Sequence, residues 1–93
     1  NELIIPDNYS IASIYPNPFN PVTKITYGLP EYSAVQIVVF NLSGHQVESL
    51  INESQTTGYH SINWNADNHP SGMYIVRATS NAYTTSQKIM LLK

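Results

Sequence analysis

The chain has 93 residues, 42% of them hydrophobic and 11% charged, a composition that indicates one packed domain and excludes a disordered tail. The formal net charge is −2 with four Lys and Arg residues, too few for the basic face of a nucleic-acid-binding protein. No apolar run is long enough to span a membrane, and the absence of Cys excludes disulfides and thiolate metal sites.

Residues 1–9 carry apolar side chains that follow no period, and Pro6 interrupts them. We therefore predict that residues 1–9 form a linker to an upstream protein, with backbone open to a peptidase. The domain itself is predicted over residues 10–93, where short β-type runs recur and turn residues separate them.

The first three runs lie between residues 10 and 40. Residues 10–15 form the first, which ends at residues 16–21 because three prolines there remove amide donors and prevent pairing in the middle of a sheet. Residues 24–29 alternate between apolar and polar positions, as a half-buried strand does. Residues 35–40 are apolar on both faces, which predicts a central strand.

The remaining runs lie between residue 45 and the end of the chain. Residues 45–51 have polar interruptions typical of an edge strand. Residues 59–65 alternate in a way that places Trp64 on the apolar face, and residues 73–80 and 83–92 are predicted to pair as a hairpin. No helical apolar stripe persists, so the sequence predicts an all-β, immunoglobulin-like antiparallel sandwich of about seven strands.

The polar residues form no recognisable catalytic motif. The sequence lacks a nucleophile elbow, a Gly-rich phosphate loop and a closely spaced pair of carboxylates. His45, His60 and His69 lack the spacing of a metal site; His60 is predicted to be half-buried on a strand, and His45 and His69 to face solvent. We therefore predict that the chain is not an enzyme and needs no cofactor or metal.

One loop contains candidate calcium ligands. Asn65, Asp67 and Asn68 supply oxygen atoms of the kind that calcium binds, but no bidentate Glu follows at the needed distance. An Asx turn, in which these side chains bond their own backbone, explains the same residues.

Trp64 and the seven tyrosines allow two interpretations. Exposed aromatic rings stack on sugars, so a carbohydrate-binding platform predicts an exposed Trp64. The alternation with Ile62 instead predicts that Trp64 belongs to the core.

An ordered set of motifs runs through residues 10–93. It comprises Tyr15-Pro16-Asn17-Pro18-Phe19-Asn20-Pro21, Ile25-x-Tyr27-x-Leu29-Pro30, Val39-Phe40-Asn41-x-x-Gly44, Gly58-Tyr59-His60, Trp64, Ser71-Gly72-Met73-Tyr74 and Lys88-Ile89-Met90-Leu91-Leu92-Lys93. This order resembles type A C-terminal sorting domains of the type IX (Por) secretion system. It also resembles the immunoglobulin-like domains of flagellar hook-capping proteins, in which a Gly follows the Trp. The stretch Trp64-Asn65-Ala66 lacks that Gly, which favours the sorting domain.

The resemblance implies a function in export. Domains of this kind form immunoglobulin-like sandwiches at the end of secreted proteins. The type IX translocon at the outer membrane recognises them, and a sortase-like surface peptidase then removes them from the covalently attached upstream cargo. The expected location is the periplasm in transit and then the cell surface or the medium. Two alternatives stay open, a structural or adhesive immunoglobulin-like module and a carbohydrate-binding accessory domain of a secreted enzyme.

The motif residues fall into two groups. The first is expected to be mainly structural and consists of Asn17, Pro18, Phe19, Gly44, Gly58, Trp64, Gly72 and Tyr74. Within it, Phe19 is expected to close one end of the sandwich, Gly72 to avoid a Cβ clash, and Tyr74 to pack under a loop. The second group is the candidate recognition strip of Lys88, Ile89, Met90, Leu91, Leu92 and Lys93. This strip is either an edge strand guarded by lysines or a surface that the translocon reads by strand addition.

Overall fold

The computed structural model describes residues 8–81 and 83–93, and within them the chain forms seven strands. The strands are β1 (Ser10–Tyr15), β2 (Val22–Leu29), β3 (Ser33–Asn41), β4 (Gln46–Gln55), β5 (Gly58–Asn65), β6 (Gly72–Ser80) and β7 (Tyr83–Leu91). A search of these described residues finds no helix long and apolar enough to cross a membrane. The predicted strand number is confirmed.

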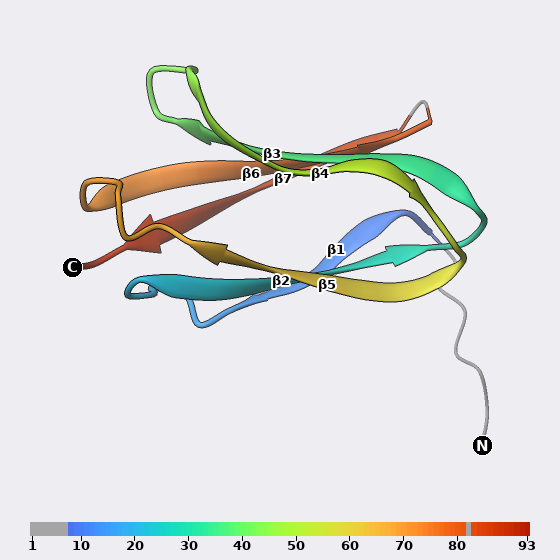
Figure 1. Ribbon diagram of the computed structural model, residues 1–93, viewed down its shortest axis with the longest axis horizontal. Coiled ribbons are helices and arrows are strands. Elements are labelled where there is room, and N and C mark those ends of the chain that lie inside the picture. The colour runs from blue at the N-terminus through green and yellow to red at the C-terminus, as the bar shows by residue number, and fades with distance from the viewer. Residues whose placement is uncertain (1–7, 82) are drawn as a thin grey trace.

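The strands form two antiparallel sheets that pack face to face (Figure 1). One sheet has the order β1-β2-β5 and the other the order β4-β3-β6-β7. This is the predicted sandwich, with β3 inside its sheet and β4 at an edge, as expected. Strand β4 continues to Gln55, past the predicted end at Ile51, because its polar residues pair with β3 while facing solvent.

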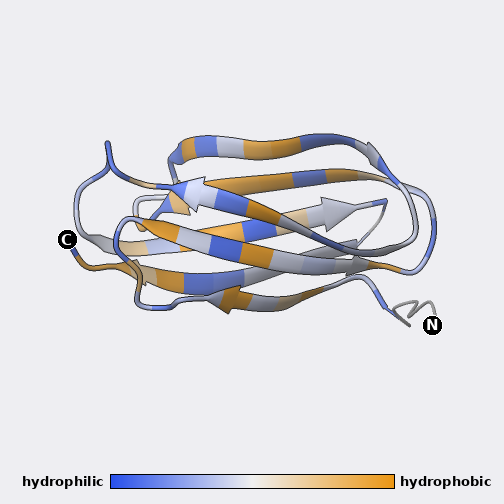
Figure 2. Ribbon diagram, turned by 60° about the horizontal axis from the view of Figure 1, so that its bottom comes forward, coloured by the Kyte–Doolittle hydropathy of each residue, from blue (hydrophilic) through white to orange (hydrophobic). Residues whose placement is uncertain are grey.

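Side chains alternate between the core and solvent along most strands, and Figure 2 shows the matching alternation of hydropathy. On β2, the predicted inward set of Ile25, Tyr27 and Leu29 is buried. On β3, Val38 is buried on the outer face as well, which fits its place between two other strands. The core therefore runs through the whole space between the sheets.

Gly44, Gly58 and Gly72 adopt backbone conformations that other residues rarely take. Gly44 has φ +88° in the turn between β3 and β4, and Gly72 has φ +149° where β6 begins. A Cβ atom built on Gly72 would meet no atom within 4 Å, so the expected steric clash at this position is wrong. Backbone conformation, not crowding, explains the glycine there.

The predicted linker lies mostly outside the described residues, since the description begins at Asn8. Tyr9 packs on the domain, with its ring centroid 5.6 Å from that of Tyr83. Its hydroxyl lies 2.9 Å from Ser33 Oγ and donates to Glu31 Oε2 at 3.0 Å. Tyr9 is thus attached to the sandwich immediately ahead of β1.

Adjacent residues on β3 test the inward and outward alternation. Ile37 is fully buried and Gln36 is exposed on the opposite face. We expect Ile37→Ala to lower the free energy of unfolding by about 2–5 kcal/mol, because it removes buried methyl groups and leaves a cavity. Gln36→Ala should change it by less than about 0.5 kcal/mol. Urea unfolding of both variants measures the difference, and equal losses would contradict the assigned register.

Candidate recognition surface at the C-terminal end of the sandwich

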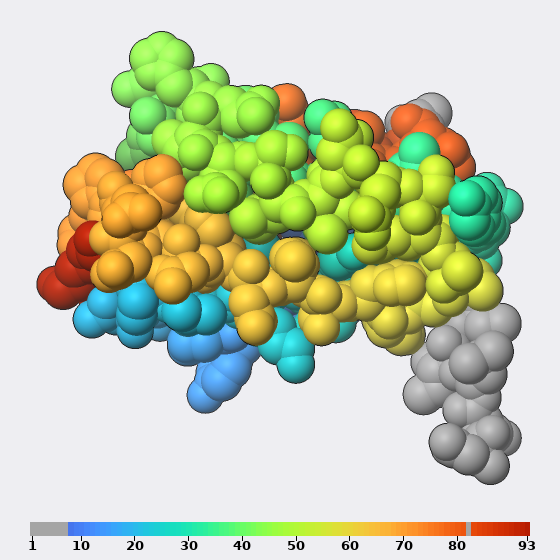
Figure 3. All heavy atoms as spheres, in the orientation of Figure 1, coloured from blue at the N-terminus to red at the C-terminus, as the bar shows by residue number. Residues whose placement is uncertain are grey.

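Three segments distant in the chain meet at one end of the sandwich. They are the NPFNP segment (residues 17–21) between β1 and β2, the β5–β6 loop (residues 66–71), and the chain from residue 88 to residue 93. Figure 3 shows the β5–β6 loop in orange against the red C-terminal residues, with the β1–β2 connection in blue below them. We call this composite the end surface.

The NPFNP segment pairs with the outer edge of β7. Phe19 N donates to Met90 O at 3.0 Å, and Leu92 N donates to Phe19 O at 2.9 Å. The side-chain oxygen of Asn17 accepts a third bond from Met90 N at 3.0 Å. Proline has no backbone N–H to donate, and the backbone donor from this segment to β7 is the amide of Phe19. The edge that strand addition would use is therefore already occupied at Met90 and Leu92.

The Phe19 side chain anchors the segment in the core. It is buried, and its ring centroid lies 5.6 Å from that of Trp64. The buried hydroxyl of Thr23 donates to Pro16 O at 2.7 Å, which fixes the start of the connection. The expectation that Phe19 closes one end of the sandwich is confirmed.

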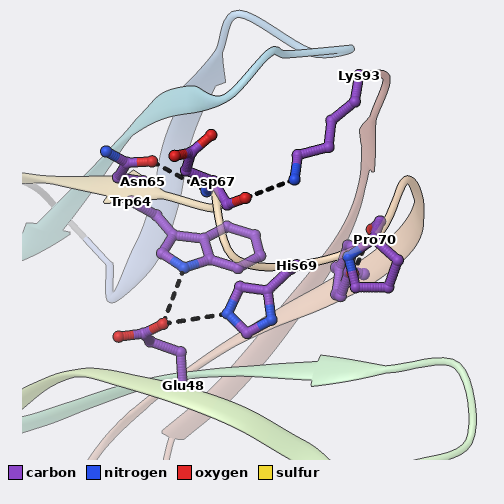
Figure 4. Close-up of polar contacts among 8 residues, drawn as sticks. Glu48, Trp64, Asn65, Asp67, His69, Pro70 and Lys93 are labelled. Atoms are coloured by element: carbon purple, nitrogen blue, oxygen red, sulfur yellow. Dashed lines mark hydrogen bonds and ion pairs between the residues drawn. The ribbon is translucent and has the colours of Figure 1, made fainter.

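The β5–β6 loop contacts both the NPFNP segment and Lys93. Ala66 N donates to Pro21 O at 2.8 Å and so joins this loop to the NPFNP segment. Lys93 N donates to Ser71 Oγ at 3.0 Å. The Lys93 ammonium group also donates to the backbone oxygen of Asp67, as Figure 4 shows.

A polar and aromatic cluster lies behind the loop (Figure 4). Trp64 is 1% exposed and its Nε1 donates to Glu48 Oε1 at 3.3 Å. The Tyr74 ring meets the Trp64 ring edge-on at 5.4 Å, and the Tyr74 hydroxyl donates to Pro70 O at 2.6 Å. Tyr74 therefore packs under a loop, as predicted, and burial raises its pKa above the ordinary value.

The prediction that His69 faces solvent is wrong. Its side chain is only 21% exposed, and its ring centroid lies 5.6 Å from that of Trp64. His69 Nε2 lies 3.4 Å from Glu48 Oε1, so one carboxylate oxygen faces both rings. Glu48 comes from β4, and no local pattern in the sequence indicates that it meets this loop. His60 is half-buried and His45 exposed, as predicted.

The burial of Trp64 contradicts the carbohydrate-platform interpretation. That interpretation depends on an exposed indole ring, whereas this ring contacts Phe19, His69 and Tyr74 inside the sandwich. The alternative prediction, a core position for Trp64, is confirmed.

The candidate calcium loop forms an Asx turn. Asn65 Oδ1 accepts a bond from Asp67 N at 3.0 Å, and the Asp67 backbone oxygen accepts the Lys93 ammonium group. Within residues 8–81 and 83–93, no three His, Asp or Glu side chains gather as metal ligands. The Asx-turn interpretation therefore accounts for the side-chain oxygen of Asn65.

The fold divides the candidate recognition strip by strand alternation. Ile89 and Leu91 are 1% and 0% exposed and belong to the core. Lys88, Leu92 and Lys93 are exposed, and Met90 is half-buried on the outer face of the sheet. Four of the six residues are thus accessible in the folded domain, and β7 is an edge strand that the NPFNP segment partly covers.

Comparison with known proteins gives one family and one informative relative. The family model described as "Secretion system C-terminal sorting domain" matches residues 13–92. The ulvan lyase NLR42 of Nonlabens ulvanivorans is 43% identical over 79 residues, which cover 81% of this chain and 13% of the lyase. No solved structure matches the chain.

Asn17 should stabilise the end surface through the Met90 amide. We expect Asn17→Ala to lower the free energy of unfolding by about 1 kcal/mol, because the Met90 N–H loses its acceptor. Hydrogen exchange at the Met90 and Leu92 amides should become faster, as NMR can measure. Asn20→Ala is the control, since Asn20 is exposed and its side chain makes no hydrogen bond to the described residues. Equal effects of the two substitutions would count against the pairing.

The buried Tyr74 phenol should make stability depend on alkaline pH. Its folded-state pKa is raised above 10.0 by burial, so the folded state holds the proton more tightly than the unfolded state. The stabilisation is complete below about pH 10 and is lost as the pH rises through the folded-state pKa. We expect Tyr74→Phe to show a smaller loss of unfolding free energy than wild type at alkaline pH, measured by urea unfolding. An unchanged slope would show that Tyr74 does not titrate with folding.

Proposed function

Since the chain belongs to the secretion system C-terminal sorting domain family, we propose that the export machinery reads the folded end surface of its sandwich. Domains of this family are signals for type IX secretion, and the proteins that carry them are exported to the cell surface or released. The family is non-catalytic. The observation that carries the proposal is the attachment of Met90, Leu92 and Lys93 to two other loops.

A folded surface is a better signal here than a linear peptide. Reading residues 88–93 as an extended peptide would require Ile89 and Leu91 to leave the core. Each such exposure costs about 1.5–3 kcal/mol for the side chain alone. It would also break the β6–β7 pairing and the bonds to the NPFNP segment. Recognition of Lys88, Leu92 and Lys93 in place has none of these costs.

The remaining partners are part of the same proposal. We propose that the receptor is the type IX translocon at the outer membrane, and that a sortase-like peptidase cuts the chain ahead of Tyr9. A cut there leaves every strand from β1 to β7 intact. The chain spans 13% of the length of the curated relative it matches. We propose that its parent is likewise a larger secreted protein whose activity lies in another part.

Reporter fusions in a host with a type IX secretion system test the proposal. A reporter carrying the whole chain should appear in the medium or on the cell surface. A reporter carrying only residues 88–93 should stay in the periplasm, because six residues cannot rebuild the end surface. Phe19→Ala in the whole chain should also reduce export, since loss of this ring destabilises the fold by about 3–5 kcal/mol.

The matched control for this experiment is Gln36→Ala, an exposed position away from the end surface. Its export should equal that of wild type. Full export by residues 88–93 alone would show that the signal is linear, and the proposal would be wrong.

A further inference from the structure

The outer face of the four-stranded sheet has two unlike halves. In an antiparallel sandwich this face meets water and is normally polar. Near the β6–β7 turn the face is polar, because one row of cross-strand neighbours consists of Asn52, Gln36, Thr79 and Thr84.

Toward the end surface, the corresponding row changes in character. There Phe40 pairs with Ile75, and Ile75 pairs with Lys88. Met73 and Met90 form the next outward pair. We call this region the outer patch, and its members are Phe40, Leu42, Met73, Ile75, Arg77, Lys88 and Met90.

The outer patch is accessible and hollowed. Figure 1 shows that one face of the four-stranded sheet points away from the three-stranded sheet, and the strand pairing places the outer patch on that face. Leu42 is 64% exposed, while Phe40 and Ile75 are half-buried. Together with Arg77 they line a shallow hollow in this face. Neighbouring apolar side chains on a solvent-facing sheet favour an interaction site, and Met is a residue that adapts to a partner.

The charges around the patch are of one sign. Arg77 lies over the Phe40 ring at 4.4 Å, and Lys88 is the exposed neighbour of Ile75. These are two of the four cationic residues in the whole chain. Across the described part of the chain, the only ion pair is His69 with Glu48, so neither cation has a carboxylate partner there.

We propose that the outer patch docks a protein component of the export machinery that presents apolar side chains bordered by carboxylates. Apolar contact would fill the hollow, and the carboxylates would meet Arg77 and Lys88. A second copy of this chain fits less well, because a two-fold contact would bring like charges together. The inference rests on the proposed function and adds a second surface to it.

Single charge reversals on the two sheets provide the test, in the reporter fusion with the whole chain. Arg77→Glu lies in the outer patch and outside the end surface, and Lys24→Glu is its matched control on β2 of the other sheet, also exposed. We expect Arg77→Glu to lower the exported fraction by about tenfold, because like charges then face each other across the contact. Lys24→Glu should export like wild type.

Ile75→Thr provides a second variant that keeps β-branching and replaces the apolar side chain with a smaller, more polar one. It should also reduce export, and urea unfolding should show that each variant stays folded. Export of both patch variants at the wild-type level would overturn the inference and leave the proposed function standing. Failure of the wild-type fusion to be exported would overturn both.

Two measurements on the purified chain test whether a membrane or a second copy of the chain binds the outer patch instead of a protein partner. Flotation with vesicles containing phosphatidylglycerol, lost in Arg77→Glu, would identify an anionic membrane as the occupant and overturn a protein partner. Sedimentation that shows a dimer in wild type but not in Ile75→Thr would identify a second copy and overturn it as well. The expected result is neither flotation nor dimerisation.

Discussion

The pairing of Phe19 with the end of β7 is the constraint on which the rest of this structure depends. It joins the first loop of the domain to its last strand, and the two residues that it connects most closely, Phe19 and Leu91, are both buried. The hydrogen bonds that Met90 and Leu92 make with this segment satisfy backbone groups that an edge strand would otherwise leave open. The C-terminal residues therefore occupy a defined position, which a signal read as a surface requires.

A second connection joins the two sheets beneath this end. Trp64 comes from the three-stranded sheet, while Glu48 and Tyr74 come from the four-stranded sheet. A buried N–H group needs a hydrogen-bond acceptor, and the Glu48 carboxylate accepts the bond from the Trp64 indole N–H. His69 lies against both the ring and the carboxylate, so the β5–β6 loop is held over the core. That loop in turn positions Ser71 and its bond to Lys93.

Strand β7 serves two surfaces because its side chains alternate. Its inward residues, Ile89 and Leu91, complete the core, and its outward residues, Lys88 and Met90, belong to the outer patch. The end surface and the outer patch therefore meet at the same strand. An export component that contacts both would bind the last strand without removing it from the sheet.

The sequence by itself determined the all-β class, the seven strands, the central place of β3, and the burial of Phe19, Trp64 and Tyr74. The class, the strands and the burial of Trp64 follow from local alternation and turn chemistry, which depend on neighbours along the chain, while the positions of Phe19 and Tyr74 are expected from the ordered motifs. Only the tertiary structure decided that the NPFNP segment covers β7, that Glu48 meets His69, and that Gly72 serves backbone conformation. Each of these depends on contacts between distant segments or on a dihedral angle, and a linear pattern encodes neither. The same reason separates the six residues 88–93 into core and surface, because only the paired sheet defines its inner face.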